Sequence, residues 1–167
     1  MTIITTASTA DISTIQTLAH SIWPNAYGDI ISHAQIDYML QLIYSETALL
    51  QQMKNGHQFL LAYHNESPVG YASFSVKSTE TPQLFRLHKL YVDTTLHTRG
   101  IGKALLLQVV NNCKQQGATG LELNVNKYNK ALHFYNKMGF SISKEEVIDI
   151  GNGYVMDDYV MTLPIVH

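Results

Sequence analysis

The sequence predicts a mixed α and β fold (α+β): a single domain with one central, mostly antiparallel sheet flanked by helices. Three observations predict this class. The first third has helical periodicity, the middle consists of short β-rich runs typical of a meander, and helices alternate with strands afterwards. A chain of 167 residues with 46% hydrophobic content can bury one core and is short for two domains. We therefore expect residues 1–167 to form one unit.

The opening third is predicted to be a strand followed by three helices. TIITT has the β-branched composition of a strand. Apolar residues then recur at helical spacing up to Trp23-Pro24, where we expect the first helix to end: Ile12, Ile15, Leu18, Ala19 and Ile22. Ser32 and Ser45 are N-cap candidates for two more helices, the last with Leu49, Leu50 and Met53 facing inward.

The middle of the chain predicts an antiparallel meander that leads into a long helix. The strands are FLLAY, VGYASFSV and LFRLHKLYV, separated by a turn at residues 65–68 and a polar stretch that ends at Pro82. A polar loop with Gly100 and Gly102 precedes the helix, whose apolar positions are 101, 105, 106, 109, 110 and 113. Gly117 is its expected stop.

The last third predicts a strand, a helix and a closing hairpin. LELNV is the strand, residues 129–138 are the helix, and residues 140–150 and 154–163 form the hairpin. Asn129 can cap this helix. The adjacent Asp157 and Asp158 indicate a bulge in the hairpin, and its apolar composition is compatible with a homodimer.

Composition and charge exclude several function classes. Eleven Lys and Arg against thirteen Asp and Glu leave a net charge of -2, which provides no basic surface for nucleic acid or an anionic membrane. One cysteine cannot form an internal disulfide or a cysteine-rich metal site, and the eight histidines lack the helical spacing of a zinc site. Without a membrane-length apolar run or a signal-like N-terminus, we expect a cytoplasmic protein that binds no metal.

The strand-to-helix turn at Gly100 is the most informative segment. Its glycines let backbone N–H groups converge, and the first N–H groups of the helix are unpaired at the positive end of its dipole. Such a turn binds phosphate, and Arg99 and Lys103 add positive charge. The dinucleotide fingerprint fails at Leu105 and the P-loop fails at Ala104. On these residues alone, an ordinary tight turn is the alternative.

The run LHKLYVDTTLHTRGIGKALL, followed by LELNVNKYNKALHFYNKMGF, resembles the GNAT superfamily of acyl-CoA-dependent N-acyltransferases. In that family the pattern Gln/Arg-x-x-Gly-x-Gly/Ala holds the CoA pyrophosphate, and His97 stands here where the family has Gln or Arg. The resemblance implies a GNAT-like domain with a splayed sheet and acetyl-CoA as co-substrate. The implied pyrophosphate contacts are His97, Thr98, Arg99, Gly100, Ile101, Gly102 and Lys103.

The same resemblance implies further site residues. Backbone groups of Leu90, Tyr91 and Val92 would pair with the pantetheine arm, in a gap between the strands at residues 84–92 and 120–126. Tyr135 would be the general acid that protonates the departing thiolate, and Asn129 would touch the cofactor, with Asn126 as the alternative. From the residues alone, a buried strand and a core tyrosine explain the pattern equally well.

The acceptor amine must be neutral before it attacks. For a Lys-like amine with a pKa of about 10.4, neutralisation at pH 7 costs roughly 4 to 5 kcal/mol, against about 1 kcal/mol for an α-amine. Many family members have a Glu where Asn124 stands, and Glu122 lies on the same strand face as a candidate base, direct or through water. A solvent-facing strand residue is the other interpretation of Glu122. Asp149, Asp157 and Asp158 are candidates for holding a cationic substrate.

We thus expect an N-acetyltransferase in which a primary amine attacks acetyl-CoA directly, without a covalent enzyme intermediate. The expected acceptor is a small amine or polyamine, and a protein N-terminus or lysine is the alternative. A third hypothesis is a non-catalytic acyl-CoA-binding module, which the Asn at position 124 favours. Trp23, Tyr27, Tyr38 and Tyr44 either line the acceptor pocket or pack in the core, where we also expect Cys113.

Overall fold

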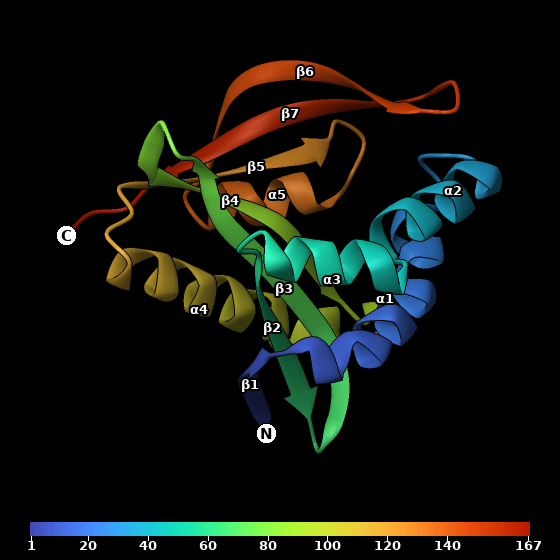
Figure 1. The fold of residues 1–167 in the computed structure, drawn as a ribbon, viewed down its shortest axis with the longest axis horizontal. Coiled ribbons are helices and arrows are strands. Elements are labelled where there is room, and N and C mark those ends of the chain that lie inside the picture. The colour runs from blue at the N-terminus through green and yellow to red at the C-terminus, as the bar shows by residue number, and fades with distance from the viewer.

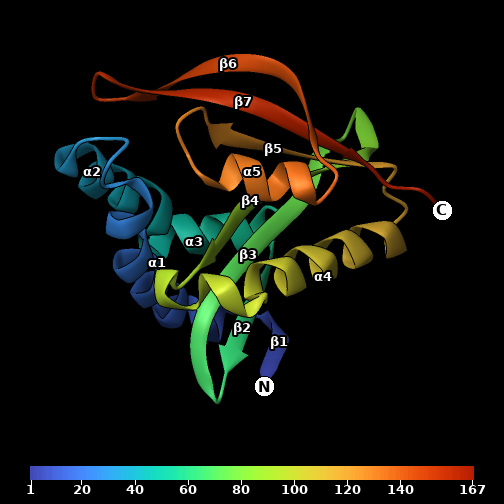
Figure 2. The same ribbon diagram turned by 180° about the vertical axis from the view of Figure 1, so that it is seen from behind.

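The computed structural model describes residues 1–167, apart from the side chain of Thr98, and contains one seven-stranded sheet with helices on both faces (Figures 1 and 2). The strand order is β1-β2-β3-β4-β5-β7-β6, and the pairings are antiparallel except between β4 and β5. The predicted mixed α and β class is confirmed. Among the described residues, no helix is long and apolar enough to cross a membrane.

Seven strands and five α-helices follow one another along the chain, with short 3-10 turns at Thr9–Asp11 and Thr94–Arg99. Their bounds are β1 (Thr2–Ala7), α1 (Ile12–Tyr27), α2 (His33–Tyr44), α3 (Glu46–Lys54), β2 (Gln58–His64), β3 (Ser67–Ser78), β4 (Thr81–Val92), α4 (Ile101–Gln115), β5 (Gly120–Asn126), α5 (Ala131–Lys137), β6 (Ser141–Gly151) and β7 (Tyr154–Pro164).

Helices α1 to α3 cover one face of β2, β3 and β4 (Figure 1). The predicted apolar stripe of α1 is buried, and Ser32 and Ser45 cap α2 and α3 by accepting from backbone N–H groups. The predicted end of α1 at Trp23-Pro24 is wrong, since the helix continues to Tyr27. Pro24 lies on the exposed side, where water can bind the carbonyl that it leaves free, while Trp23 packs against Tyr27 at 4.6 Å.

The α3 prediction is also partly wrong. Leu49 is buried as expected, but Leu50 is 41% exposed. Successive helix residues point about 100° apart, and only one side of this short helix contacts the rest of the protein. Leu50 therefore faces away from the core.

Helices α4 and α5 cover the opposite face of the sheet (Figure 2). The predicted apolar face of α4 packs there, and its cysteine, Cys113, is fully buried. Gly117 ends this helix with a φ of +87°. The sheet therefore separates two apolar clusters, one under α1–α3 and one under α4–α5.

Turns and bulges differ from the sequence-based expectation at two places. β3 and β4 pair as far as Ser78 and Thr81, whose hydroxyl oxygens lie 3.0 Å apart, so the expected polar stretch to Pro82 is mostly strand. The bulge expected at Asp157 and Asp158 is wrong, because both pair regularly with β6 and the register shifts lie elsewhere in the hairpin. Alternation along β7 instead sends the two carboxylates to opposite faces.

β4 and β5 part halfway along their length. Their parallel pairing joins Leu84–Leu87 to Gly120–Leu123 and stops there, although β4 continues to Val92 and β5 to Asn126. The register of β4 with β3 shifts at His88, immediately after the last paired residue, Leu87. A bulge bends a strand and increases its local twist, so His88 marks the point where β4 turns away from β5.

Candidate active site

A cleft of about 610 Å³ occupies the gap between the parted strands. β4, β5, the start of α4, the end of α1 and α5 all contribute to its walls. Five elements distant in sequence therefore meet at the opening that the end of the β4–β5 pairing creates.

The first turn of α4 opens onto this cleft without a cap. Gly100 is the N-cap of the helix with a φ of +74°, and no side chain of the described residues accepts a hydrogen bond from the first N–H groups. Gly100, Gly102 and Lys103 line the cleft. Uncapped amides at the positive end of a helix dipole, beside a lysine, form a site for an anionic group such as phosphate.

The free edge of β4 forms another wall. The Asp93 N–H donates to the Val69 carbonyl of β3 at 2.8 Å. Because backbone groups alternate sides along a strand, the N–H and C=O groups of Leu90 and Val92 point away from β3 and toward the cleft, while those of Tyr91 point toward β3. An extended ligand can add to this edge as a further strand.

Of the loop side chains that the resemblance implies as pyrophosphate contacts, some line the cleft and others do not. His97 lines the cleft, and its Nε2 donates to the Val92 carbonyl at 3.0 Å, so it occupies one acceptor of the free edge. Arg99 is exposed and Ile101 is buried under the sheet, and neither belongs to the cleft walls. The side chain of Thr98 lies outside the described part of the chain.

The two candidate asparagines are separated. Asn129 lines the cleft, and its Oδ1 accepts from the Ala131 N–H at 2.9 Å, so it caps the start of α5 as predicted. Asn126 is buried, lies outside the cleft walls and accepts from the Tyr128 N–H at 2.9 Å. The geometry therefore favours Asn129 as the contact for a molecule in the cleft.

Tyr135 projects from α5 into the cleft. It is buried and makes edge-to-face contacts with Phe134 and Phe140, at ring-centroid distances of 5.3 and 5.6 Å. Burial raises the pKa of Tyr135 well above its usual value, with a smaller contribution from Tyr27. The phenol is consequently protonated at neutral pH and able to donate a proton or a hydrogen bond.

Two more tyrosines form the opposite wall. The hydroxyl oxygens of Tyr27 and Tyr91 lie 2.7 Å apart, and both residues line the cleft. Trp23 and Tyr44, the other aromatic candidates of the first helices, are buried in the core, and Tyr38 instead packs against Tyr154. The side chain of Tyr91 was missed because only its backbone had a predicted role.

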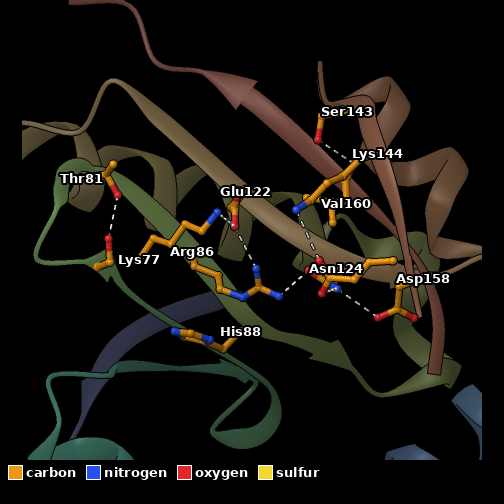
Figure 3. A network of polar contacts seen from close by, with 12 residues as sticks. Lys77, Thr81, Arg86, His88, Glu122, Asn124, Ser143, Lys144, Asp158 and Val160 are labelled. Atoms are coloured by element: carbon orange, nitrogen blue, oxygen red, sulfur yellow. Dashed lines mark hydrogen bonds and ion pairs between the residues drawn. The ribbon is translucent and has the colours of Figure 1, made fainter. Parts of the chain in front are cut away.

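Glu122 lies in a polar row on the α1–α3 face of the sheet and outside the cleft walls (Figure 3). Its Oε1 is 2.9 Å from both Arg86 Nη1 and Lys77 Nζ. Arg86 also donates to Oδ1 of Asn124, which does line the cleft. The structure thus brings Asn124, and not the predicted base, to the cleft.

Two basic side chains of β4 were also not identified from the sequence. Lys89 is only 6% exposed; its Nζ donates to Gln52 Oε1 at 2.6 Å, and burial lowers its pKa to about 7. His88 stacks on His57 at 4.0 Å and bonds Ser75 Oγ; burial, followed by the charge of His57, lowers its pKa to about 3. Lys89 is buried and His88 is half-buried at the bulge of β4, and no local sequence pattern indicates either.

Comparisons with known proteins identify the family to which this mixed sheet, with its parted parallel pair, belongs. The chain belongs to the acetyltransferase (GNAT) domain family, whose model matches residues 30–163. The chain is also 24% identical, over 156 residues, to a spermidine N(1)-acetyltransferase of Thermoplasma acidophilum, a match that covers 90% of this chain and 92% of that protein.

Two solved structures share the fold, and one further relative matches part of the chain. A solved structure of the PaiA N-acetyltransferase from Thermoplasma acidophilum in complex with coenzyme A has a TM-score of 0.81, 24% identity, and coverage of 98% of this chain and 99% of that one. The ribosomal-protein-S18-alanine N-acetyltransferase of Escherichia coli has a TM-score of 0.75 at 18% identity, covering 100% and 96%. An uncharacterised N-acetyltransferase of Methanocaldococcus jannaschii is 31% identical over 94 residues, and the chain spans 41% of its length.

Proposed function

We propose that this protein transfers an acetyl group from acetyl-CoA to a primary amine, and that the acceptor is a small amine or polyamine. One observation carries the proposal: an uncapped helix start, a free strand edge and a buried tyrosine line the same cleft. The similarity to a spermidine acetyltransferase over nearly the full length supports the choice of acceptor.

The cleft residues fit an acyl-CoA. The amides at the start of α4 and the ammonium of Lys103 would hold the pyrophosphate, and the backbone groups of Leu90 and Val92 would pair with the amide-containing pantetheine arm. When bound, acetyl-CoA supplies a thioester whose carbonyl carbon the amine attacks and whose sulfur leaves as a thiolate. His97 would keep the Val92 carbonyl oriented at the edge.

Tyr135 is the proposed general acid. The Tyr135 phenol is protonated at neutral pH, and burial raises its pKa further, which makes it a weaker acid. It would donate a hydrogen bond to the sulfur as the C–S bond breaks and pass its proton to the thiolate, whose conjugate acid has a pKa of about 8.5. Asn129, at the start of the same helix, would orient the ligand next to it.

The amine proton requires a separate assignment. The Glu122 carboxylate is bound to two cations, and taking a proton would disrupt both ion pairs. We therefore propose that the amine loses its proton to water and that Glu122 positions Arg86, which in turn holds Asn124 at the cleft wall.

Thiol release measured with acetyl-CoA and a panel of acceptors tests this proposal. The panel contains short monoamines, diamines, an N-terminal peptide and a lysine peptide, and calorimetry measures coenzyme A binding separately. We expect coenzyme A binding together with rapid thiol release with the small amines. Preferential acetylation of a peptide would refute the acceptor class, and binding without thiol release for any amine would identify a non-catalytic module.

A further inference from the structure

The polar row on the α1–α3 face ends at a carboxylate without a cation. Figure 3 shows Arg86 between Glu122 and Asn124, with Asp158 beyond Asn124. In the register, Arg86 faces Glu122 across β4–β5, and Asp158 of β7 faces Glu146 of β6. Glu122 has two cationic partners in this row, whereas Asp158 forms no ion pair with any described residue.

The environment of Asp158 is unusual for a carboxylate. Asp158 is only 5% exposed, and its Oδ2 accepts from Asn124 Nδ2 at 3.3 Å. The other oxygen, Oδ1, is buried and has no hydrogen-bond partner among the described residues. Burial raises the pKa of this carboxyl above its usual value; the hydrogen bond from Asn124 lowers it, the charge of Glu146 raises it, and the charge of Arg86 lowers it. A cationic donor at Oδ1 would favour the charged carboxylate.

A second carboxylate meets the same amide. Asn124 Nδ2 lies 3.4 Å from Glu146 Oε1 as well as 3.3 Å from Asp158 Oδ2. The amide is neutral, and the cation nearest Glu146, Lys144, is exposed and 3.6 Å away. A primary ammonium has three donors and a positive charge, and Asp158 has no ion-pair partner of that kind among the described residues.

This site adjoins the cleft. Asn124, which binds Asp158, lines the cleft, and so does Tyr27. Burial raises the pKa of Tyr27 to about 12, with the negative charge of Asp158 contributing. Asp158 is not itself among the residues that line the cleft, but it contacts Asn124, which is.

We propose that Asp158, assisted by Glu146, binds the second ammonium group of an acceptor that carries a charged amino group at each end. The inference rests on the proposed function, because it assigns the far end of the acceptor to this site while the near amine attacks the thioester. A diamine or polyamine pairs with Asp158, whereas a monoamine leaves the carboxylate without a partner.

A matched pair of acceptors tests this assignment. 1,4-Diaminobutane and butylamine have the same carbon chain and differ by one ammonium group. For the wild type we expect kcat/KM to be about tenfold or more higher for the diamine, since a charged hydrogen bond is worth roughly that factor or more. Asp158→Asn should raise KM for the diamine about tenfold to hundredfold, with kcat nearly unchanged and butylamine unaffected.

The neighbouring carboxylate provides the control. Asp157 lies 3.0 Å from Lys127 and already has its cation. Asp157→Asn should therefore leave the preference for the diamine as in the wild type. An equal loss of kcat/KM for both amines in Asp158→Asn, or an intact preference for the diamine, would overturn the assignment.

A binding measurement keeps the inference independent of turnover. Calorimetric titration of each amine into the protein, with coenzyme A present, should show tighter binding of the diamine than of butylamine. This difference in affinity should disappear in Asp158→Asn. Equal affinities of the two amines for the wild type would overturn the inference. If circular dichroism shows that Asp158→Asn is unfolded, Glu146→Gln replaces it, with an expected loss of about threefold to tenfold in diamine affinity. If no amine causes thiol release, the proposed function is refuted, and the calorimetric titration still decides whether Asp158 binds the second ammonium group.

Discussion

Among single side chains, the tyrosines of the cleft share one electrostatic property. Burial raises the pKa values of Tyr27, Tyr91 and Tyr135, so all three hydroxyls remain protonated at neutral pH. Tyr27 and Tyr91 are hydrogen-bonded to each other at 2.7 Å. Their hydroxyls can position a polar group in the cleft, whereas Tyr135 projects from the opposite side on α5.

Replacement of Tyr135 by Phe tests the general acid. The aromatic packing against Phe134 and Phe140 remains, and only the hydroxyl is lost. We expect kcat to fall about 10- to 100-fold, with acetyl-CoA affinity within about twofold of the wild type. Steady-state thiol release and calorimetry measure the two quantities. Tyr154→Phe, in the hairpin, is the control, and equal turnover in wild type and Tyr135→Phe would exclude the role.

Lys89 makes folding stability depend on pH. Burial lowers its pKa from 10.5 to about 7, so between these values the unfolded chain binds more protons than the folded one. The free energy of unfolding should therefore rise with pH across this window, and the full penalty for the charged amine is present below about pH 7.

Lys89→Met removes this penalty. The thioether chain keeps the contacts with the rings of Tyr44 and Phe59, which lie 5.5 and 5.4 Å from the ammonium. We expect the free energy of unfolding at pH 7 to increase by about 1 to 3 kcal/mol. Urea unfolding at several pH values below 10, where tyrosines are still protonated, should also show a flatter pH dependence. An unchanged pH dependence in Lys89→Met would show that folding does not lower the pKa of Lys89.

At the level of elements, α4 owes its proposed anion site to its first turn. A Cβ at Gly102 would lie 3.7 Å from Phe134 Cζ and 3.8 Å from Val92 Cγ2, which are ordinary contacts. The fold therefore accepts a side chain at this position. The glycine is needed only if a ligand approaches the backbone closely.

Gly102→Val should separate binding from folding. We expect coenzyme A affinity to fall by a factor of about 30 or more, because a branched side chain would stand between the α4 amides and a phosphate, with a change in unfolding free energy below about 1 kcal/mol. Gly117→Ala is the control: its φ of +87° predicts lower stability, but it lies at the far end of α4 and should bind coenzyme A normally. Wild-type affinity in Gly102→Val, measured by calorimetry, would remove the proposed phosphate site.

The parting of β4 and β5 is the element-level feature on which the cleft depends. The bulge at His88 follows the last paired residue, Leu87, and both strands continue beyond it. Because the free edge of β4 is created by this bend, the site is built by strand geometry rather than by a loop.

For the whole molecule, one sheet separates two apolar clusters that have no residue in common. Strands β2, β3 and β4 contribute alternate side chains to both clusters, as Leu60 and Leu61 of β2 illustrate. Loss of either cluster would expose one face of the strands whose opposite face forms the remaining cluster. We propose on this ground that residues 1–167 fold as one cooperative domain.

Two intrinsic probes test this cooperativity. Trp23 is the single tryptophan and lies in the α1–α3 cluster, while Cys113 is the single cysteine and lies in the α4–α5 cluster. In urea, Trp23 fluorescence and Cys113 thiol reactivity should change with the same midpoint, matching circular dichroism. Midpoints that differ beyond experimental error would show two separately folding units.

The sequence by itself determined the helices, the strands and the glycine turn. Helical spacing identified the buried faces of α1 and α4, Ser32 and Ser45 identified two caps, and composition identified each strand. Such features depend on neighbours within one or two turns of chain, which a sequence pattern records directly. Pro24 is one of the exceptions, because burial of Trp23 and Tyr27 outweighs the local preference to end the helix.

Only the tertiary structure decided which charged and aromatic side chains share a site. The sheet register places Glu122 next to Arg86 and leaves Asp158 beside Glu146 without a cation. Packing of α1 on β4 brings Tyr27 to Tyr91. Each of these partners is distant in sequence from the residue that it meets, and their pairing depends on strand order and on the bulge at His88, which no local pattern encodes.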